Sequence, residues 1–210
     1  MKKIVLLLFL IPFIGLAKFY KATVTMNDGT LKSGFIALPS YPDDAKIKFR
    51  TEENGDTEKL SVDAVKGFDI ILKDNQTYEY ITMYTAYKGK GDYLKIDKKK
   101  CWVRIVEEGK INLCSTNSIG TAAMMGVPGS GISESITYYI NRPGDDFAIY
   151  VTDIYGYGTT CVNCFSAFKK MIANIFEKDC PKLVDLIEKD DFKKNGYVRI
   201  VELYEQNCGK

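Results

Sequence analysis

The spacing of the apolar residues changes once along this chain, after Val151, and that change predicts the fold class. Before it, short segments alternate apolar and polar residues, with turn signals such as Asn27-Asp28-Gly29 between them, as half-buried strands do. After it, the apolar residues from Phe165 to Phe176 recur every three or four positions, as on one face of a helix. Strands first and helices last predict an α+β protein. We expect an antiparallel β region over 18–151, a small barrel or sandwich, and a helical region of about three helices over 152–210.

The alternation predicts ten strands and one long loop. The expected strands are Tyr20–Met26, Leu31–Ala37, Lys46–Arg50, Lys59–Val62, Val65–Leu72, Thr77–Tyr87, Cys101–Val106, Lys110–Ser115, Ser135–Asn141 and Phe147–Val151. Four glycines and a proline between Gly120 and Gly131 predict a mobile loop there. Its apolar residues Met124, Met125 and Val127 are the expected contact surface for a protein or envelope partner, because such side chains adapt to varied surfaces. The alternative is that the loop folds back onto the β core.

The first seventeen residues have the layout of a secretory signal peptide. Met1-Lys2-Lys3 is basic, Ile4–Leu16 is an almost unbroken apolar run, and small residues stand at the −3 and −1 positions before Lys18. The run of about 14 residues is shorter than the roughly 20 that span a bilayer. We therefore expect cleavage after Ala17, export to the periplasm or the outside of the cell, and no integral membrane segment in the cleaved chain.

Charge and composition exclude several classes of function. Removing Lys2 and Lys3 lowers the 29 basic residues to 27, which equals the 27 acidic residues. A chain with no net charge has little attraction for a phosphate backbone, so nucleic acid is not an expected partner. The chain has no His, which removes the usual general base and the imidazole metal ligands. We accordingly expect no metal and no cofactor.

Six cysteines in an exported chain predict disulfide bonds. Cys180 precedes the helix that Pro181 begins, and Cys208 follows the last helix. If these helices pack antiparallel, the two cysteines meet, so a Cys180–Cys208 bridge is expected. For a loop of this length the bridge stabilises the fold by about 3–4 kcal/mol.

Cys101 and Cys114 are a second candidate pair, on the two arms of a hairpin around Glu108-Gly109. A two-residue turn would place Val103 opposite Cys114 and leave Cys101 diagonal to it. Diagonal Cα atoms tend to be too far apart for a bridge without a shift in register, so the pairing stays open.

Cys161-Val162-Asn163-Cys164 is a C-x-x-C motif at the start of a predicted helix. One interpretation is a thiol–disulfide exchange site, because a helix N-terminus lowers the pKa of the first thiol and the second resolves the mixed disulfide. Thioredoxin-like enzymes carry this motif early in a βαβ unit, whereas here it follows nearly the whole β region. That position favours a structural disulfide. A zinc site with Cys180 and Cys208 is the weaker alternative, since that second pair lacks the close spacing.

Tyrosines recur in the expected strand Thr77–Tyr87, at Tyr78, Tyr80, Tyr84 and Tyr87. Aromatic rings on one face of a strand could bind a carbohydrate. The simpler interpretation is the ordinary preference of tyrosine for half-buried strands, in which alternate side chains point the same way.

Three stretches carry a resemblance to other proteins. They are Asn27–Ile36, then Glu108–Leu113 with Tyr138-Tyr139-Ile140, and Asp179–Leu183 with Glu202-Leu203-Tyr204 and Cys208. In these the chain resembles a group of uncharacterised exported proteins of Bacteroidota-type bacteria. The resemblance implies export, and it implies no activity and no catalytic residues.

Together these features predict an exported, non-catalytic envelope or secreted protein with a binding or structural role. The alternative is a thiol–disulfide oxidoreductase that uses Cys161 and Cys164.

Overall fold

The part of the chain that the structure describes forms ten strands followed by four helices. This structure is a computed structural model, and it describes residues 18–72, 75–122, 131–155 and 164–208. The protein is therefore mostly β with a small helical C-terminal part, and the broad α+β class is confirmed. The expected signal peptide lies outside the described residues.

Most strands lie close to their predicted positions. They are β1 (Phe19–Met26), β2 (Leu31–Ala37), β3 (Lys46–Arg50), β4 (Glu58–Ser61), β5 (Val65–Ile71), β6 (Thr77–Lys88), β7 (Leu94–Glu107), β8 (Asn112–Ala122), β9 (Gly131–Asn141) and β10 (Phe147–Tyr155). Strand β7 begins seven residues before the predicted Cys101, and β8 and β10 run past their predicted ends.

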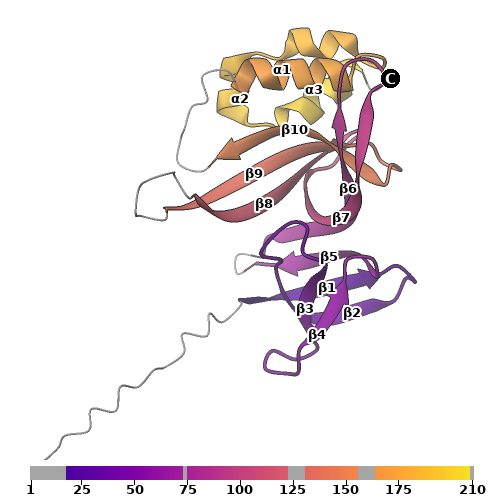
Figure 1. Cartoon of the computed structure of the whole chain (residues 1–210), viewed down its shortest axis with the longest axis vertical. Helices are drawn as coiled ribbons and strands as arrows, with labels where there is room; N and C mark the ends of the chain where they lie inside the picture. Colours follow the sequence, from indigo (N-terminus) through magenta and orange to yellow (C-terminus); the bar gives the residue numbers. More distant parts are fainter. Residues whose placement is uncertain (1–17, 73–74, 123–130, 156–163, 209–210) are drawn as a thin grey trace, which may run out of the picture.

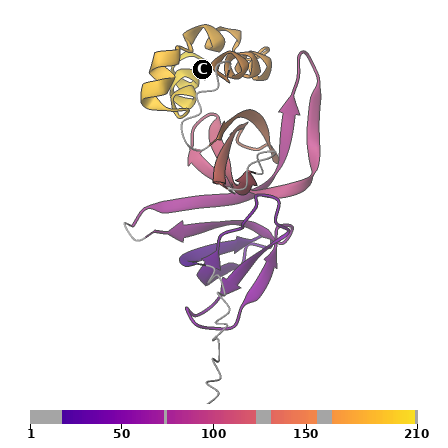
Figure 2. The same ribbon diagram turned by 60° about the vertical axis from the view of Figure 1, so that its left-hand side comes forward.

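Strands β1 to β5 form a curled sheet in the order β5-β1-β2-β3-β4 (Figure 2). Alternate residues point inward, among them Val24, Ile36, Phe49 and Phe68, and they form one apolar core. The close crossing of β2 and β3 requires glycine at position 34, because a Cβ there would overlap the Arg50 carbonyl oxygen.

Strands β6 to β10 close into a small five-stranded barrel. Neighbours pair antiparallel from β6 to β10, and β10 then pairs with β6 in parallel, from Phe147 opposite Tyr84 to Ile149 opposite Ala86. Met83, Val103, Cys114 and Ala148, one from each of four strands, form the buried interior. The predicted β region is thus a curled sheet joined to a barrel, with one parallel pairing among the antiparallel ones.

The helices cover the outer face of the barrel at β8, β9 and β10 (Figure 1). They are α1 (Cys164–Ile175), the 3-10 helix η1 (Pro181–Leu186), α2 (Lys189–Asn195) and α3 (Arg199–Asn207). Phe168, Ile172 and Phe176 pack against Leu113, Ile140 and Ile149 of the strands in one shared core. Among the described residues, none of the helices has the length and apolar character needed to cross a membrane.

Strands β6 and β7 make one long ribbon that belongs to both halves of the molecule. The first residues of β6 pair with β5, and the later ones pair with β10. A bulge between Tyr84 and Ala86 bends the ribbon. Its tip rises beside the barrel toward the helices (Figure 2), where Asp92 forms an ion pair with Lys178.

Both ends of the glycine-rich stretch are strand, so the prediction of a loop over Gly120–Gly131 is corrected there. Gly120 pairs with Ser133, and Ala122 pairs with Gly131, as the last rungs of the β8–β9 ladder. Glycine is accepted in these rungs because a ladder uses only backbone N–H and C=O groups. The expected contact residues Met124, Met125 and Val127 lie outside the described residues.

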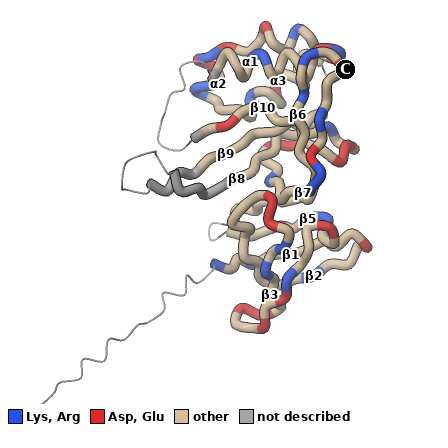
Figure 3. The backbone as a smooth tube through the Cα atoms, viewed as in Figure 1, with Lys and Arg blue, Asp and Glu red and all other residues tan. Residues whose placement is uncertain are grey.

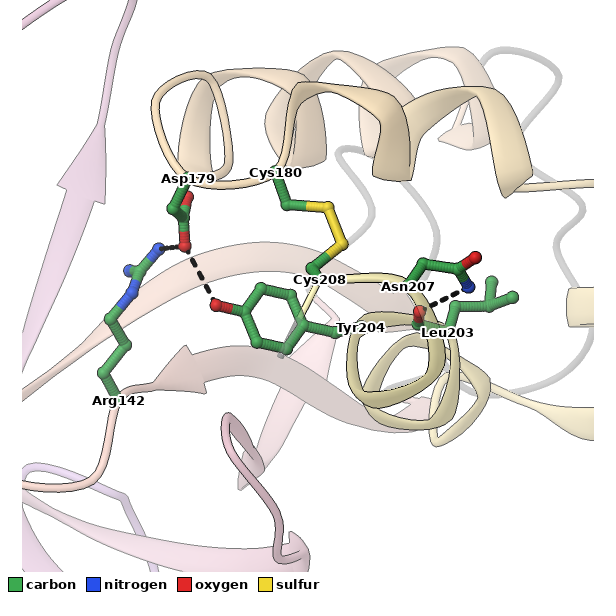
Figure 4. Close-up of a disulfide and its surroundings, with 7 residues drawn as sticks. All are labelled: Arg142, Asp179, Cys180, Leu203, Tyr204, Asn207 and Cys208. Carbon is green, nitrogen blue, oxygen red and sulfur yellow. Dashed lines mark hydrogen bonds and ion pairs between the residues drawn. A yellow bond between two sulfur atoms is a disulfide. The ribbon is translucent and has the colours of Figure 1, made fainter. Parts of the chain in front are cut away.

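Cys180 and Cys208 form the expected disulfide, with their Cα atoms 5.7 Å apart (Figure 4). Cys180 precedes η1, and Cys208 caps α3. Beside the bridge, the Asp179 carboxylate accepts hydrogen bonds from Arg142 at 2.8 Å and from the Tyr204 hydroxyl at 3.1 Å. The bridge and this carboxylate together fix α3 to the rest of the helices and to the β9–β10 connection.

Replacing Cys180 and Cys208 together by alanine should lower the free energy of unfolding by about 3–4 kcal/mol. The bridge closes a segment with a sequence separation of 28, and its loss frees that segment in the unfolded chain. Urea denaturation followed by circular dichroism measures the change. Cys101→Ala, which removes a thiol outside any disulfide, is the control. A loss smaller than about 1 kcal/mol for the double variant would contradict the prediction.

Candidate functional site

A groove of about 390 Å³ lies where the curled sheet meets the barrel. This volume falls within the range of about 300–1,000 Å³ that small-molecule sites occupy, and such sites favour the junctions between structural units. Its lining comes from Lys18 and β1, the end of β2, the β2–β3 connection, β6, β7, β8 and β9. The residues are Lys18, Tyr20, Ala37, Leu38, Pro39, Ser40, Pro42, Tyr80, Trp102, Arg104, Ser115, Asn117, Ser135 and Ile136.

Stacked rings make the apolar wall of the groove. Phe68 stacks on Tyr80 with ring centroids 4.8 Å apart and lies against Trp102 at 5.7 Å. Burial raises the pKa of the Tyr80 hydroxyl, so this phenol stays neutral. The rings belong to the core of the curled sheet, and that core holds the wall rigid.

The β2–β3 connection makes a second wall, and Trp102 holds it in place. The Trp102 indole N–H donates to the Asp44 carbonyl oxygen at 2.7 Å, and its backbone N–H donates to the Pro42 carbonyl oxygen at 2.9 Å. The Asp44 carboxylate in turn accepts the backbone N–H groups of Ser40 and Tyr41, at 2.8 and 3.0 Å. This wall is therefore formed before any ligand arrives.

Arg104 supplies the charged part of the groove. In the ladder it pairs with Tyr80 of β6 on one side and with Ser115 of β8 on the other. Its guanidinium lies over the Tyr78 ring, 3.7 Å from the centroid. Its Nε is buried and has no hydrogen-bond acceptor among the described residues.

Lys18 adds a second positive charge at the edge of the groove, with its Nζ 4.7 Å from the centroid of the Tyr20 ring. No acidic residue is found among the described residues that line the groove. Elsewhere on the described chain, basic and acidic residues are distributed over both halves (Figure 3). The groove is thus a locally positive site on a molecule of mixed charge.

A second hollow lies beside the barrel, lined by Thr85, Ala86, Tyr87, Asp97, Tyr139 and Tyr150. It is more open to solvent than the groove. Its Asp97 carboxylate already accepts the Thr85 hydroxyl at 2.7 Å. We regard the groove as the stronger candidate, because it is more enclosed and because Arg104 lines it without a carboxylate beside it in the described lining.

The second candidate disulfide is not formed, because Cys101 and Cys114 are free thiols. The register places Ile105, not Val103, opposite Cys114, and pairs Cys101 with Met83. Four residues of strand therefore separate Cys101 from the position opposite Cys114, roughly 13 Å at 3.3 Å per residue. Disulfide Cα atoms lie within about 7 Å of each other, so this register forbids the bridge.

The C-x-x-C motif falls at the edge of the described chain. Cys161 lies outside the described residues, and Cys164 is the first residue of α1. Neither the exchange site nor the structural bridge between them is tested. Within the described ranges, no group of three or more Cys, Asp or Glu side chains is placed to hold a metal ion.

Two of the four tyrosines noted in the predicted strand Thr77–Tyr87 belong to the groove or support it. Tyr80 lines the groove and Tyr78 supports Arg104, whereas Tyr84 and Tyr87 lie further along the ribbon. Arg104, Trp102 and Lys18 were not predicted as site residues from the sequence. The alternation along the strand could have placed Trp102 and Arg104 on one face, whereas Lys18 has no such signal.

The two free thiols should react slowly in the folded protein. Burial, with the nearby charge of Glu79, raises the pKa of Cys114 to about 12, and burial with the Asp43 charge also raises that of Cys101. With iodoacetamide at about pH 8, Cys114 should stay unlabelled and Cys101 should label slowly, since the thiolate is the reactive form. Peptide mass mapping measures both, with protein in guanidinium chloride as the fully labelled control. Rapid labelling of Cys114 in the folded protein would contradict this burial.

No protein-family model matches this sequence, and no curated protein and no solved structure shows significant similarity to it. What the groove binds therefore has to be inferred from its own chemistry.

Proposed function

We propose that this chain is an exported, non-catalytic binding protein whose ligand occupies the groove between the curled sheet and the barrel. The observation that carries the proposal is the groove itself, a ring-lined hollow of ligand size at the junction of two cores.

The walls support binding because they are held in place by contacts that no ligand has to make. Trp102 holds the β2–β3 connection through two hydrogen bonds, and Phe68 holds the rings from behind. A site that is ordered in advance loses little conformational entropy when a ligand enters, and this favours affinity.

The side chains of the groove support binding rather than catalysis. Its hydroxyl groups come from serines and tyrosines, and the chain contains no His to act as their base. The free thiols Cys101 and Cys114 pack in the barrel cluster instead of lining the groove.

Export is proposed from the sequence, and one structural feature is compatible with it. The signal-peptide layout of residues 1–17 and the resemblance to exported bacterial proteins suggest the compartment. The Cys180–Cys208 disulfide suits an oxidising environment, where such bonds persist. We place the protein in the periplasm or outside the cell.

The neutral fluorophore N-phenyl-1-naphthylamine tests the binding function. Trp102 is the single Trp of the chain and borders the groove, so energy transfer from Trp102 to the probe reports occupancy there. We expect saturable transfer with one site per chain. Ile136→Thr, which keeps the branched shape but makes this wall polar, should weaken binding about fivefold, as expected for about 1 kcal/mol of lost apolar contact.

Ile71→Thr is the matched control, because Ile71 is 42% exposed on β5 and lies outside the groove lining. It should leave the affinity for the probe unchanged. The proposal fails if transfer does not saturate, or if the two isoleucine variants weaken it equally.

A further inference from the structure

We propose that the groove selects small organic anions and that Arg104 binds the anionic group. The inference rests on the proposed binding function and names the class of ligand. That class is a carboxylate, sulfonate or phosphate attached to a flat or chain-like apolar body.

The position of Arg104 directs its side chain toward the groove. Successive residues of a strand alternate between faces, so Arg104 shares the face of Trp102, while Val103 between them packs in the barrel cluster. The directly paired Tyr80 lies on the same face and also lines the groove. The guanidinium is thus presented between the ring wall and the barrel strands.

The stacking of Arg104 leaves the edge of its guanidinium free for a ligand. Tyr78 covers one planar face at 3.7 Å, but the N–H groups point outward in the guanidinium plane. The buried Nε–H has no acceptor among the described residues, and an unsatisfied buried donor destabilises the site. An oxygen pair from a carboxylate or phosphate matches the planar fork that the guanidinium N–H groups form.

Arg50 is a structural arginine of this fold, and its contacts can be compared with those of Arg104. Its guanidinium also lies over a ring, that of Phe19, at 3.9 Å. Its Nε donates to the Thr57 hydroxyl at 2.9 Å, and its Nη1 donates to the Glu53 carbonyl oxygen at 3.2 Å. Arg50 and Arg104 thus share the stacking, but among the described residues only the Nε of Arg50 has an acceptor.

The surrounding charges favour an anion. Lys18 provides a second cation, and no carboxylate occurs among the described lining residues. Asp69 and Glu79 stand opposite each other in the ladder of β5 and β6, and Glu79 alternates with Tyr80, so this acidic pair is on the other face. The apolar walls lower the local dielectric and strengthen the attraction between Arg104 and a bound anion.

The rest of the groove fits an apolar body rather than a second charged group. Its apolar walls include the rings of Tyr80 and Trp102 and the side chains of Leu38 and Ile136, and the polar lining residues besides Lys18 and Arg104 are uncharged. A ligand that places its charge on Arg104 would lay its apolar part along these walls.

A matched pair of fluorophores tests the inference. 1-Anilinonaphthalene-8-sulfonate is N-phenyl-1-naphthylamine with one added sulfonate, so the ratio of their dissociation constants isolates the effect of the charge. Energy transfer from Trp102 measures both. For the unmodified protein we expect the sulfonate to bind about tenfold or more tightly than the neutral probe, as a charge-assisted hydrogen bond predicts.

Arg104→Gln should bring that ratio close to one while binding of the neutral probe persists. Arg104→Lys keeps the charge but not the planar fork, so it should retain only part of the preference. Arg50→Gln removes the same charge from the same kind of stacking and should leave the ratio unchanged. Circular dichroism confirms that each variant is folded. If Arg104→Gln does not fold, the ratio of the two dissociation constants is compared between the unmodified protein and Arg104→Lys, and a lower preference for the sulfonate in Arg104→Lys supports the role of Arg104.

Several outcomes would overturn the inference. Equal affinity for both probes in the unmodified protein removes the anion preference but leaves the binding function standing, whereas binding of neither probe removes both. A preference that survives Arg104→Gln, or that Arg50→Gln abolishes equally, removes the role of Arg104. Displacement of the neutral probe by 1-naphthoate and by 1-naphthyl phosphate, compared with neutral 1-naphthalenemethanol, then identifies the preferred head group. Equal displacement by all three also contradicts the proposal.

Discussion

The β6–β7 ribbon is the constraint on which the rest of the structure depends. Its two strands complete the curled sheet at one end and close the barrel at the other, and the bulge between Tyr84 and Ala86 bends it between these tasks. Neighbouring residues of β7 serve different cores, since Trp102 packs with the curled sheet and Val103 with the barrel cluster. The groove exists because two surfaces of different curvature meet along this ribbon and cannot fit closely together.

The sequence predicts the strands well wherever burial makes residues alternate. Strands β2 and β3 have their predicted bounds, and in β3 buried Ile47 and Phe49 alternate with exposed Lys46 and Lys48. The first half of β7, Leu94–Lys100, was missed, since these residues are mostly exposed and charged and show no alternation. The strand there is imposed by pairing with β6, which is tertiary information. The glycine-rich rungs of β8 and β9 were also missed, because their pairing is likewise tertiary information.

The two cysteine pairs show which parts of the local geometry can be predicted from the sequence. Helix ends are marked by Pro181 and by the end of an apolar stripe, so Cys180 and Cys208 could be placed side by side. The hairpin between β7 and β8 has a longer turn than Glu108-Gly109 and a register shift before Glu107, and neither has a clear signal in the chain. The groove was beyond prediction, because its residues come from seven segments of the chain and each residue is ordinary for its own strand or loop.

The β6–β7 ribbon also determines how the protein unfolds. Three apolar clusters would suggest three independent units, yet β7 contributes residues to both the curled-sheet core and the barrel core. If Trp102 leaves the curled-sheet core, the neighbouring Val103 is displaced from the barrel core. Opening the barrel also exposes the strand faces that the helices cover. Without the ribbon, the barrel loses β6 and β7, and the curled sheet loses its pairing between β5 and β6 and the Trp102 side chain from its core. The chain should accordingly unfold in a single cooperative transition, with no stable fragment on either side of the junction.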